Sequence, residues 1–265
     1  MDFQPKTAIV TGSDSGIGKA TAVALAAAGL DIGVTWHSDR DGALATAEEV
    51  RSHGRNAVIA QLDTTDVESC AGVIDDLADR LGSVDVFVNN AALDTRHDFL
   101  TLSLDEWKTV LDTNLNGAFV CIQRAAQRMV SAGNGGRIIA VTSVHEKQPR
   151  FGACAYDTSK HGLGGLLKTV ALELGDYGIT ANTVAPGEIA TPMNDQEDAS
   201  AFSRHRPGVP LGRPGDAREI AAVVAFLASP SSSYVTGACW PVDGGMLQMG
   251  PQAGSHITSD EWRQS

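Results

Sequence analysis

The sequence contains few of the features that mark nucleic-acid-binding or membrane proteins. Its 265 residues hold 20 Lys and Arg against 32 Asp and Glu, which gives a formal net charge of −12. Such an excess of negative charge opposes binding to nucleic acid and to anionic membrane surfaces. No apolar run approaches the roughly 20 residues that a membrane-spanning helix needs. We therefore expect neither a nucleic-acid partner nor a membrane partner.

Cysteine is scarce and is not arranged for metal binding. The four cysteines are Cys70, Cys121, Cys154 and Cys239, and no two of them form a CxxC pair. Isolated cysteines without histidine at metal-ligand spacing predict reduced thiols and no metal site. The first five residues also lack the charged and apolar segments of a signal peptide. These absences favour a cytoplasmic protein.

What the sequence does contain is a regular alternation of strand and helix patterns. Short apolar runs predict strands at Thr7–Val10, Asp31–Trp36, Asn56–Leu62, Val84–Val88, Arg137–Thr142, Ile179–Ala185 and Cys239–Val242. Longer stretches, several ended by glycine, predict helices at Lys19–Gly29, Ala43–His53, Glu68–Leu81, Leu104–Ala132, Tyr156–Tyr177 and Asp216–Ala228. Such alternation predicts parallel strands joined by right-handed helical crossovers. The expected fold class is α/β, a single-domain doubly wound parallel sheet (a Rossmann fold) over residues 1–265, with helices on both faces.

Two stretches interrupt this alternation. Residues 188–213 are polar and contain proline, and residues 246–265 form a C-terminal tail. Ligands of open α/β sheets bind beyond the carboxyl ends of the strands, and long loops in compact domains are usually functional. We therefore interpret residues 188–213 as a substrate loop. The alternative is an ordinary surface loop.

A glycine-rich turn, Thr11–Gly18, joins the first predicted strand to the first predicted helix. Glycine allows the backbone to turn sharply and to approach a diphosphate closely. The start of a helix offers free N–H groups to such an anion. Taken alone, the spacing GxxxGxG also fits a tight strand-to-helix turn with no ligand.

Tyr156 and Lys160 lie four residues apart at the start of a predicted helix, so their side chains share one face. A phenol ordinarily has a pKa near 10, which is too high for acid–base catalysis at neutral pH. An ammonium group one turn away favours the phenolate and is expected to lower that pKa. Ser143 ends a predicted strand thirteen residues earlier, where its hydroxyl could orient a substrate oxygen.

Taken in order, these residues resemble the short-chain dehydrogenase/reductase family over essentially the whole chain, from Lys6 to about Gly245. The match comprises Thr11–Gly18, Asn89-Asn90-Ala91, Asn114, Ser143, Tyr156 with Lys160, Pro186-Gly187 and Thr191-Pro192. No single motif decides the resemblance, but their common order does. Ala92 departs from the glycine that usually follows Asn-Asn-Ala, and we expect a small repacking there.

The resemblance implies a role for each matched residue. Tyr156 would be the general acid and base, Lys160 would lower its pKa and hold the nicotinamide ribose, and Ser143 would position the substrate oxygen. Asn114 would hold a backbone kink and a water that relays protons. The implied cofactor-binding residues are Gly12, Ser15, Gly16, Ile17, Gly18, His37, Ser38, Asp63, Thr64, Asn90, Ala91, Tyr156, Lys160, Pro186, Gly187, Ile189 and Thr191.

The choice between the two nicotinamide cofactors depends on the end of the second predicted strand. An acidic residue there would bind the ribose 2′-hydroxyl and repel a 2′-phosphate. The sequence has Trp36 at that place, followed by His37 and Ser38. NADP(H) is therefore favoured, with NAD(H) as the alternative. Asp14 and Asp39 add negative charge that opposes the preference.

Similarity to particular members of the family narrows the choice of substrate class. Thr35–Asp39 and Ile189–Asn194 are similar to bacterial diacetyl or acetoin reductases, whereas Ser143–Lys147 is also similar to glucose 1-dehydrogenases. The first match covers more of the chain, so a small ketone or diketone is the expected substrate, with a sugar or another secondary alcohol as the alternative. The expected substrate contacts are His145, Glu188 and Met193.

Two further interpretations of the function remain open. Reduction of a ketone on an acyl carrier would favour basic residues in the substrate loop, and a cofactor-binding scaffold without catalysis would lack the tyrosine or the lysine. Here both Tyr156 and Lys160 are present. The resemblance also implies a homotetramer assembled through the long helices, Leu104–Ala132 and Tyr156–Tyr177, and the last strand.

Overall fold

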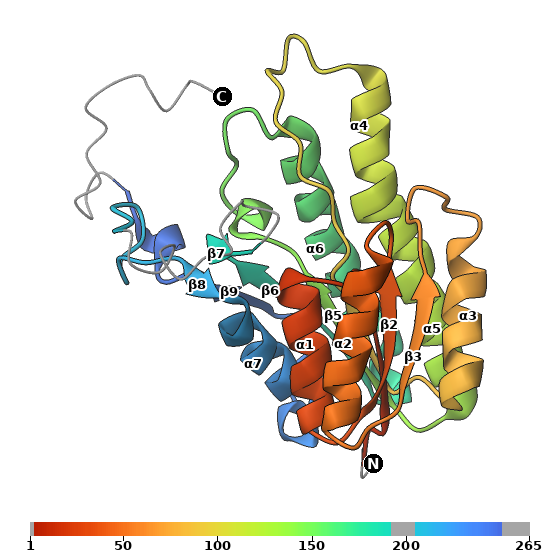
Figure 1. Ribbon diagram of the computed structural model, residues 1–265. Helices are drawn as coiled ribbons and strands as arrows, with labels where there is room; N and C mark the ends of the chain where they lie inside the picture. Colours follow the sequence, from red (N-terminus) through yellow and green to blue (C-terminus); the bar gives the residue numbers. More distant parts are fainter. Residues whose placement is uncertain (1–2, 192–204, 251–265) are drawn as a thin grey trace.

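The computed structural model of the chain describes residues 3–191 and 205–250 (Figure 1). Within these residues, seven strands pair in parallel in the order β3-β2-β1-β4-β5-β6-β9. Their bounds are β1 Thr7–Val10, β2 Asp31–Trp36, β3 Ala57–Gln61, β4 Val86–Asn89, β5 Gly136–Val141, β6 Ile179–Pro186 and β9 Cys239–Val242. The predicted doubly wound sheet is confirmed. Its strand order reverses between β1 and β4, where the carboxyl ends of the strands leave room for a ligand.

Helices cover both faces of the sheet (Figure 1). Their bounds are α1 Gly16–Ala27, α2 Arg40–Ser52, α3 Cys70–Leu81, α4 Leu104–Leu111, α5 Gly117–Ala132, α6 Cys154–Leu174 and α7 Ala217–Ala228. One apolar core lies under α1, α2 and α7, and the other lies under α3, α5 and α6. Short 3-10 turns are η2 Val144–Glu146, η3 Gly175–Tyr177, η6 Pro230–Ser232 and η7 Met246–Gln248.

The central strands contribute side chains to both cores, because successive side chains of a strand point to opposite faces of the sheet. In β1, Ala8 and Val10 belong to one core and Ile9 to the other. Such strands are apolar throughout, as expected where helices cover both faces of a parallel sheet. The rigid sheet therefore fixes the positions of the loops that follow β1, β4, β5 and β6.

The predicted helix Leu104–Ala132 is one continuous helical run, but its middle is unusual. The segment Asp112–Asn116 between α4 and α5 is a π-helix. A π-turn inside an α-helix is costly in geometry and often marks a functional site. The helical period of the sequence showed no sign of it, since the apolar pattern continues through the segment.

The substrate loop, residues 188–213, begins with a short strand that the sequence did not predict. β7 (Ile189–Ala190) pairs in parallel with β8 (Gly215–Asp216), which lies just before α7. Two-residue strands have no readable periodicity, so only the tertiary structure reveals them. This pairing closes the base of the loop, while residues 192–204 lie outside the described part of the chain.

Among the described residues, no helix combines the length and the apolar character needed to cross a membrane. The same residues contain no group of His, Cys, Asp or Glu side chains arranged to hold a metal ion.

Candidate active site

The glycine-rich turn forms a tight cradle in which three glycines are needed for different reasons. Gly12 and Gly16 have φ angles of 59° and 52°, a left-handed conformation that side chains disfavour. Gly18 lies on α1 so close to the turn that an added Cβ would collide with the carbonyl oxygen of Gly12. The turn therefore brings bare backbone to the carboxyl end of β1, where the strand order reverses.

Asn90 and Thr11 hold this turn in place. The Asn90 amide nitrogen donates hydrogen bonds to the carbonyl oxygens of Thr11 and Gly12, at 3.0 and 2.8 Å. The Thr11 hydroxyl accepts from the backbone N–H groups of Asn90 and Ala91. Both amide hydrogens of Asn90 are thus used within the protein. The family resemblance implied that Asn90 binds the cofactor, which stays a prediction.

The first turn of α1 is suited to a diphosphate. Ser15 is the N-cap residue, but its hydroxyl makes no capping hydrogen bond, and the first turn has no acidic side chain. The first N–H groups of a helix lack partners inside the helix and attract anions. Together with the glycine cradle, which a Cβ would fill, this arrangement fits the diphosphate of a dinucleotide. Ile17 packs against the core beneath.

His37 and Asp63 face each other at the ends of β2 and β3. The Nε2 atom of His37 lies 3.6 Å from the Asp63 carboxylate, and both side chains are well exposed. Asp63 also accepts hydrogen bonds from the backbone N–H and the hydroxyl of Thr65, which together with His37 hold the pKa of its carboxyl below the usual range. Ser38 is exposed beside them. This edge therefore carries a persistent negative charge next to the predicted phosphate contacts.

The other predicted cofactor residues lie along the same edge of the sheet. Thr64 is buried against the start of α5, and Ala91 lies directly over Gly12. Pro186 ends β6, and the N–H of Gly187 donates to the Val242 carbonyl at 3.1 Å. Ile189 and Thr191 are buried. The Ile189 side chain packs in the apolar core, and its backbone pairs with Gly215.

Ser143 and Tyr156 meet where β5 ends and α6 begins. Ser143 is the residue before η2, and its hydroxyl accepts from the His145 N–H at 3.2 Å. Tyr156 lies in the first turn of α6. A hydrogen bond from the Ser143 hydroxyl lowers the pKa of Tyr156, but burial of the ring raises it further, to about 12. The expected net lowering of this pKa was wrong, because desolvation of the phenolate outweighs the groups that stabilise it.

Lys160 lies one helical turn after Tyr156 and is almost completely buried. Its Nζ atom donates to the Val141 carbonyl at 3.1 Å and lies 5.4 Å from the centre of the Tyr156 ring. Burial lowers the pKa of Lys160 to about 8. The ammonium group is therefore still mostly charged at neutral pH. Keeping an ammonium group charged where so little water reaches it costs free energy. Charged groups buried in this way are typical of functional sites.

Asn114 lies in the π-helix and ties the loop after β4 to α6. Its Oδ1 atom accepts from the Leu93 N–H at 2.7 Å, and its Nδ2 atom donates to the Leu93 carbonyl and the Ser159 hydroxyl, at 2.9 and 3.0 Å. Ser159 in turn donates to the Tyr156 carbonyl. Asn114 thus lies where the helix departs from α-helical geometry, while its predicted roles in a backbone kink and a water relay stay predictions.

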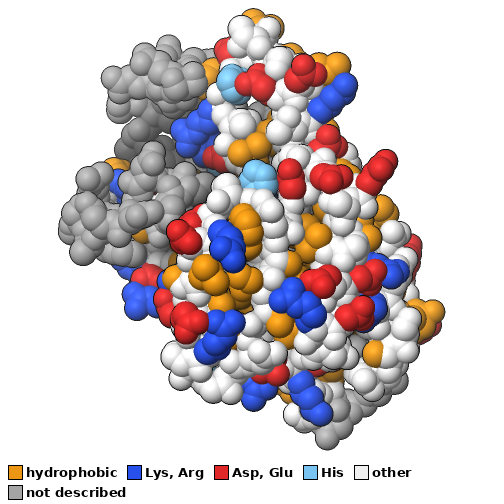
Figure 2. Space-filling model, turned by 45° about the vertical axis from the view of Figure 1, so that its right-hand side comes forward, with side chains coloured by type: hydrophobic (Ala, Val, Ile, Leu, Met, Phe, Trp, Pro, Cys, Tyr) orange, Lys and Arg blue, Asp and Glu red, His pale blue; other side chains and the backbone are white. Residues whose placement is uncertain are grey.

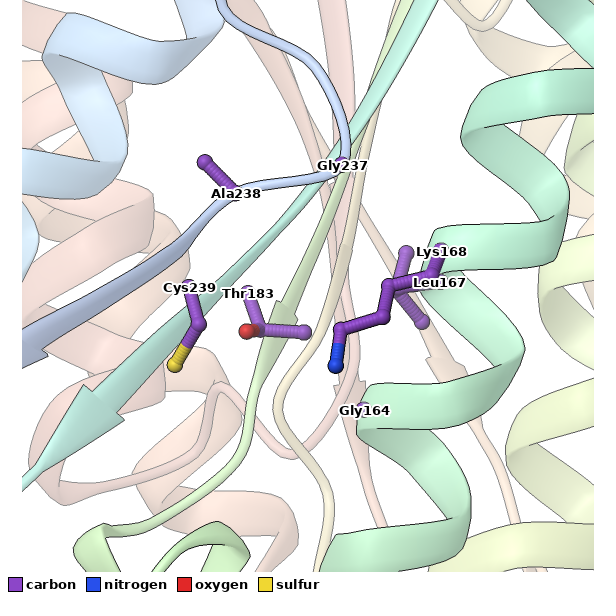
Figure 3. Close-up of a pocket in the computed structure, with 7 residues that line it drawn as sticks. All are labelled: Gly164, Leu167, Lys168, Thr183, Gly237, Ala238 and Cys239. Atoms are coloured by element: carbon purple, nitrogen blue, oxygen red, sulfur yellow. The ribbon is translucent and has the colours of Figure 1, made fainter.

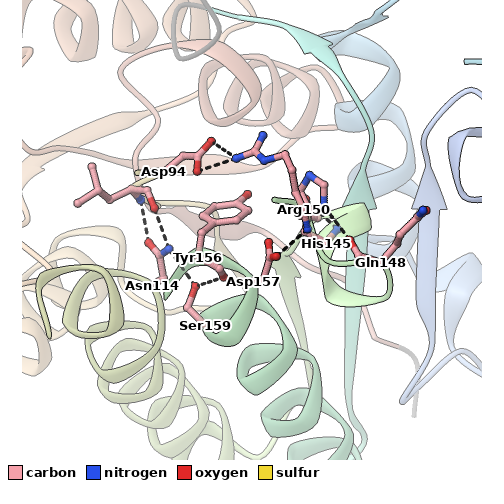
Figure 4. A network of polar contacts seen from close by, with 10 residues as sticks. Asp94, Asn114, His145, Gln148, Arg150, Tyr156, Asp157 and Ser159 are labelled. Carbon is pink, nitrogen blue, oxygen red and sulfur yellow. Dashed lines mark hydrogen bonds and ion pairs between the residues drawn. The ribbon is translucent and has the colours of Figure 1, made fainter. Parts of the chain in front are cut away.

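A polar network that the sequence did not indicate surrounds Tyr156 (Figure 4). Asp94 and Arg150 form an ion pair at 2.8 Å, and the Arg150 N–H donates to the Asp157 carboxylate at 2.7 Å. The His145 ring meets the Tyr156 ring edge-on, with centroids 6.3 Å apart. Asp94 and Arg150 lie 56 residues apart in the chain. Neither belongs to a local motif, so no sequence signal could have paired them.

The three predicted substrate residues differ in placement. His145 lies beside Tyr156, and its Nδ1 atom lies 2.8 Å from the Gln148 carbonyl. Glu188 forms an ion pair with Arg206 at 2.6 Å, across the base of the substrate loop. Its carboxylate is therefore neutralised within the protein. Met193 lies outside the described residues.

Two hollows lie close to this site without containing Tyr156. One is a shallow depression between α6, β6 and β9, lined by Gly164, Leu167, Lys168, Thr183, Gly237, Ala238 and Cys239 (Figure 3). The other, of about 410 Å³, includes Glu188, Ile189 and the start of α7.

Figure 2 shows acidic and basic side chains interspersed over the face turned to the viewer. The chemistry is therefore defined by the side chains around Tyr156 and not by the hollows.

Comparisons with known proteins agree with this geometry. Residues 12–247 match the family model adh_short_C2, described as enoyl-(acyl carrier protein) reductase. The chain is 49% identical to the uncharacterized oxidoreductase YohF of Escherichia coli K12, over 93% of this chain and 98% of that protein. It is 41% identical to an L-rhamnose 1-dehydrogenase (NAD(P)(+)) of Azotobacter vinelandii, over 91% and 96%.

A solved structure extends the comparison to three dimensions. The acetoin dehydrogenase of Enterobacter cloacae is 49% identical, covers 94% of this chain and 98% of that one, and superposes with a TM-score of 0.89. The match thus includes the glycine cradle, the π-helix region and the start of α6. The chain belongs to the short-chain dehydrogenase/reductase family, an oxidoreductase of CH–OH and C=O groups.

Proposed function

We propose that the protein reversibly reduces a small ketone or diketone to a secondary alcohol with a nicotinamide cofactor. The observation that carries the proposal is the meeting of Ser143 and Tyr156 at the carboxyl end of β5, on the same edge of the parallel sheet as the glycine cradle. The likeness to an acetoin dehydrogenase supports the substrate class. Family membership by itself would fix only the reaction type.

Tyr156 supplies the proton in this proposal. In reduction, its hydroxyl donates a proton to the carbonyl oxygen, and in oxidation the phenolate takes the proton of the alcohol. Ser143 orients the same oxygen through its hydroxyl. Because burial holds the pKa of Tyr156 near 12, the phenol is protonated at neutral pH and is ready for reduction.

Lys160 and the glycine cradle serve the cofactor. The bound cofactor supplies or accepts the hydride. The backbone at Gly12 and Gly16 and the start of α1 would hold its diphosphate, and the buried Lys160 ammonium would hold the nicotinamide ribose. Lys160 also places a positive charge beneath the Tyr156 ring, which stabilises the phenolate as the proton leaves.

His145 is the proposed contact for a substrate hydroxyl. Its Nδ1 atom faces a carbonyl oxygen, so Nδ1 carries the proton and Nε2 is an acceptor in the neutral ring. Burial lowers the pKa of His145, which favours this neutral form. A neutral acceptor beside Tyr156 suits a substrate with a hydroxyl group near the reacting carbon.

We further propose that NADP(H) is preferred over NAD(H) by a small factor. Trp36 stands where an acidic residue would select NAD(H), and His37 and Ser38, which follow it, could hold a 2′-phosphate. The carboxylate of Asp63, 3.6 Å from His37, opposes a 2′-phosphate and limits the preference. A kcat/KM ratio that favours NADH would overturn this proposal.

A homotetramer is the proposed assembly. The helices that the family likeness points to carry exposed apolar side chains, with Phe119 of α5 and Leu172 of α6 exposed at 43% and 85%. Exposed apolar side chains on neighbouring long helices are typical of an interface between subunits. Light scattering that gives the mass of one chain would contradict it.

The decisive test of the function is the initial rate of NADPH oxidation with diacetyl, with NADH in parallel. Fast turnover supports a small diketone as substrate. Oxidation of L-rhamnose or glucose with NADP⁺, in the absence of any diacetyl turnover, would favour the second candidate function, a sugar dehydrogenase. The identity to an L-rhamnose 1-dehydrogenase is the observation that favours this second candidate.

A further inference from the structure

Asp94 and Arg150 form an ion pair between two loops that flank Tyr156. The Nη2 atom of Arg150 lies 3.0 and 2.8 Å from the two carboxylate oxygens of Asp94. Asp94 lies in the loop after β4, and Arg150 lies in the loop after η2. Figure 4 shows the Tyr156 hydroxyl pointing toward this pair. The pair therefore lies on the substrate side of the acid–base group.

The main chain holds the pair from both ends. Both backbone groups of Leu93 are bonded to the Asn114 amide, which fixes the position of the next residue, Asp94. The Arg150 N–H is bonded to Asp157. The two loops are also joined by a hydrogen bond from the His97 N–H to the Gly152 carbonyl, at 2.8 Å. An ion pair anchored in this way presents its donors and acceptors in a fixed geometry.

The pair has unused hydrogen-bonding capacity. Within the described part of the chain, the Nε atom of Arg150 is buried and has no hydrogen-bond partner. A guanidinium group has five N–H donors, and both hydrogen bonds from this side chain to Asp94 leave through Nη2. Leaving a buried donor without a partner costs free energy, so the position of this side chain is not explained by its contacts within the protein. The side chains remain partly open to solvent, at 27% for Arg150 and 21% for Asp94, so a small molecule can reach them.

The electrostatics place the pair near the reacting oxygen. Asp94 raises the pKa of Tyr156 and Arg150 lowers it, so both charges act on the phenol. The other polar groups that face Tyr156 are Ser143, Lys160, His145 and Asp157. Of these, Ser143 and Lys160 are assigned to the reacting oxygen and the cofactor. Asp94 and Arg150 have no such assignment.

We propose that the Asp94–Arg150 pair determines substrate specificity by binding a second oxygen on the carbon next to the reacting one. Arg150 donates a hydrogen bond to that oxygen, and Asp94 accepts one when the oxygen is a hydroxyl. The substrates of this site are then vicinal diketones, α-hydroxy ketones and vicinal diols, in preference to simple monoketones. This inference rests on the proposed function and assigns its substrate class.

The test compares substrates that differ in the second oxygen. Arg150→Met removes the guanidinium group but keeps the stem and the N–H that binds Asp157. We expect kcat/KM for diacetyl and acetoin to fall at least ~10-fold in this variant, while kcat/KM for 2-butanone stays within about twofold of the unmodified protein. Taking the ratio of variant to unmodified protein for each substrate cancels the differing reactivity of the carbonyls.

A pH profile separates this role from a merely structural one. In alcohol oxidation, Arg150→Met should move the acid limb of kcat to higher pH, because it removes a charge that favours the phenolate. Asp94→Asn should move the limb to lower pH. Arg218→Met is the matched control, since Arg218 is also paired with an aspartate but is 84% exposed and distant in sequence from Tyr156. It should change neither the substrate ratio nor the limb.

The outcomes are distinct. If Arg150→Met slows diacetyl and 2-butanone equally, the pair does not recognise a second oxygen, and the inference is wrong while the proposed function stands. If the unmodified protein reduces none of the three ketones, the proposed function is wrong and the inference falls with it.

Discussion

The proposed cofactor site runs along the carboxyl edge of the sheet, and its two ends differ in burial and in hydrogen bonding. At the catalytic end, Asn114, Ser143 and Lys160 are buried and joined to the backbone by hydrogen bonds near 3 Å. At the adenosine end, His37 and Asp63 are exposed and separated by 3.6 Å. An unpaired buried polar group is costly, so hydrogen bonds restrict the geometry of buried polar groups closely. Exposed groups carry no such requirement. The chemistry is therefore fixed by packing, whereas cofactor choice is set by a few surface charges that are easily changed.

The largest expected effect comes from the buried end. Tyr156→Phe removes only the hydroxyl, and we expect turnover with diacetyl to fall at least ~10²-fold while the cofactor Kd stays nearly unchanged. Steady-state rates and fluorescence titration with NADPH measure the two quantities. Full activity in this variant would show that Tyr156 is not the acid–base group. The contrast between the buried catalytic end and the exposed adenosine end would then no longer hold.

The glycine cradle provides the next largest effect. Gly18→Ala places a Cβ against the carbonyl oxygen of Gly12 and the Asn90 amide. We expect cofactor binding to weaken at least ~10-fold, because the turn must move to make room. Calorimetric titration with NADPH measures this change. The matched control is Gly72→Ala in α3, where an added Cβ meets nothing within 4 Å and helix propensity predicts a gain of up to ~1 kcal/mol in stability.

We expect the buried Lys160 ammonium group to lower the free energy of unfolding of the protein. The pKa of Lys160 is lowered from 10.5 to about 8 in the folded protein. Below pH 8 Lys160 is protonated in both the folded and the unfolded chain, so the full free-energy cost of burying the charged ammonium group lowers the stability of the fold. Between pH 8 and 10.5 the unfolded chain binds more protons, so stability rises with pH. Lys160→Met removes the penalty, part of which is offset by the lost bond to Val141.

We expect Lys160→Met to raise the melting temperature by a few degrees at pH 7, at about 2–4 °C per kcal/mol. The difference should shrink toward pH 10.5, and the variant should lose most of its activity. Calorimetry at several pH values measures this. A lower melting temperature at pH 7 would show that the ammonium group stabilises the fold.

The smallest effect is predicted at the exposed end. Asp63→Asn removes the carboxylate beside His37, and we expect kcat/KM with NADPH to rise about 2–5-fold and that with NADH to change less. The gain should diminish in high salt, because exposed charges are screened. Equal changes for both cofactors would mean that Asp63 acts on the adenine and not on the 2′-phosphate.

The seven strands of the main sheet and the long helices were predicted to within a few residues, but the strands β7 and β8 and the π-helix were not. The strand β9 agrees at both ends, since its apolar run lies between Gly237 and the polar turn at Asp243-Gly244. The π-helix Asp112–Asn116 was missed because it leaves the helical apolar pattern unchanged. The lowered pKa expected for Tyr156 was wrong because the sequence shows that Lys160 is near but not how deeply the ring is buried.

The sequence by itself determined the alternation of strands and helices, the glycine-rich turn and the spacing of Ser143, Tyr156 and Lys160. These are local properties, set by periodicity, by backbone freedom and by residues four apart on one helix face. Only the tertiary structure decided the pairing of Asp94 with Arg150, the use of Asn90 to hold the turn, and the neutralisation of Glu188 by Arg206. Each of these joins side chains far apart in the chain, and such contacts depend on how the sheet brings separate loops to one edge.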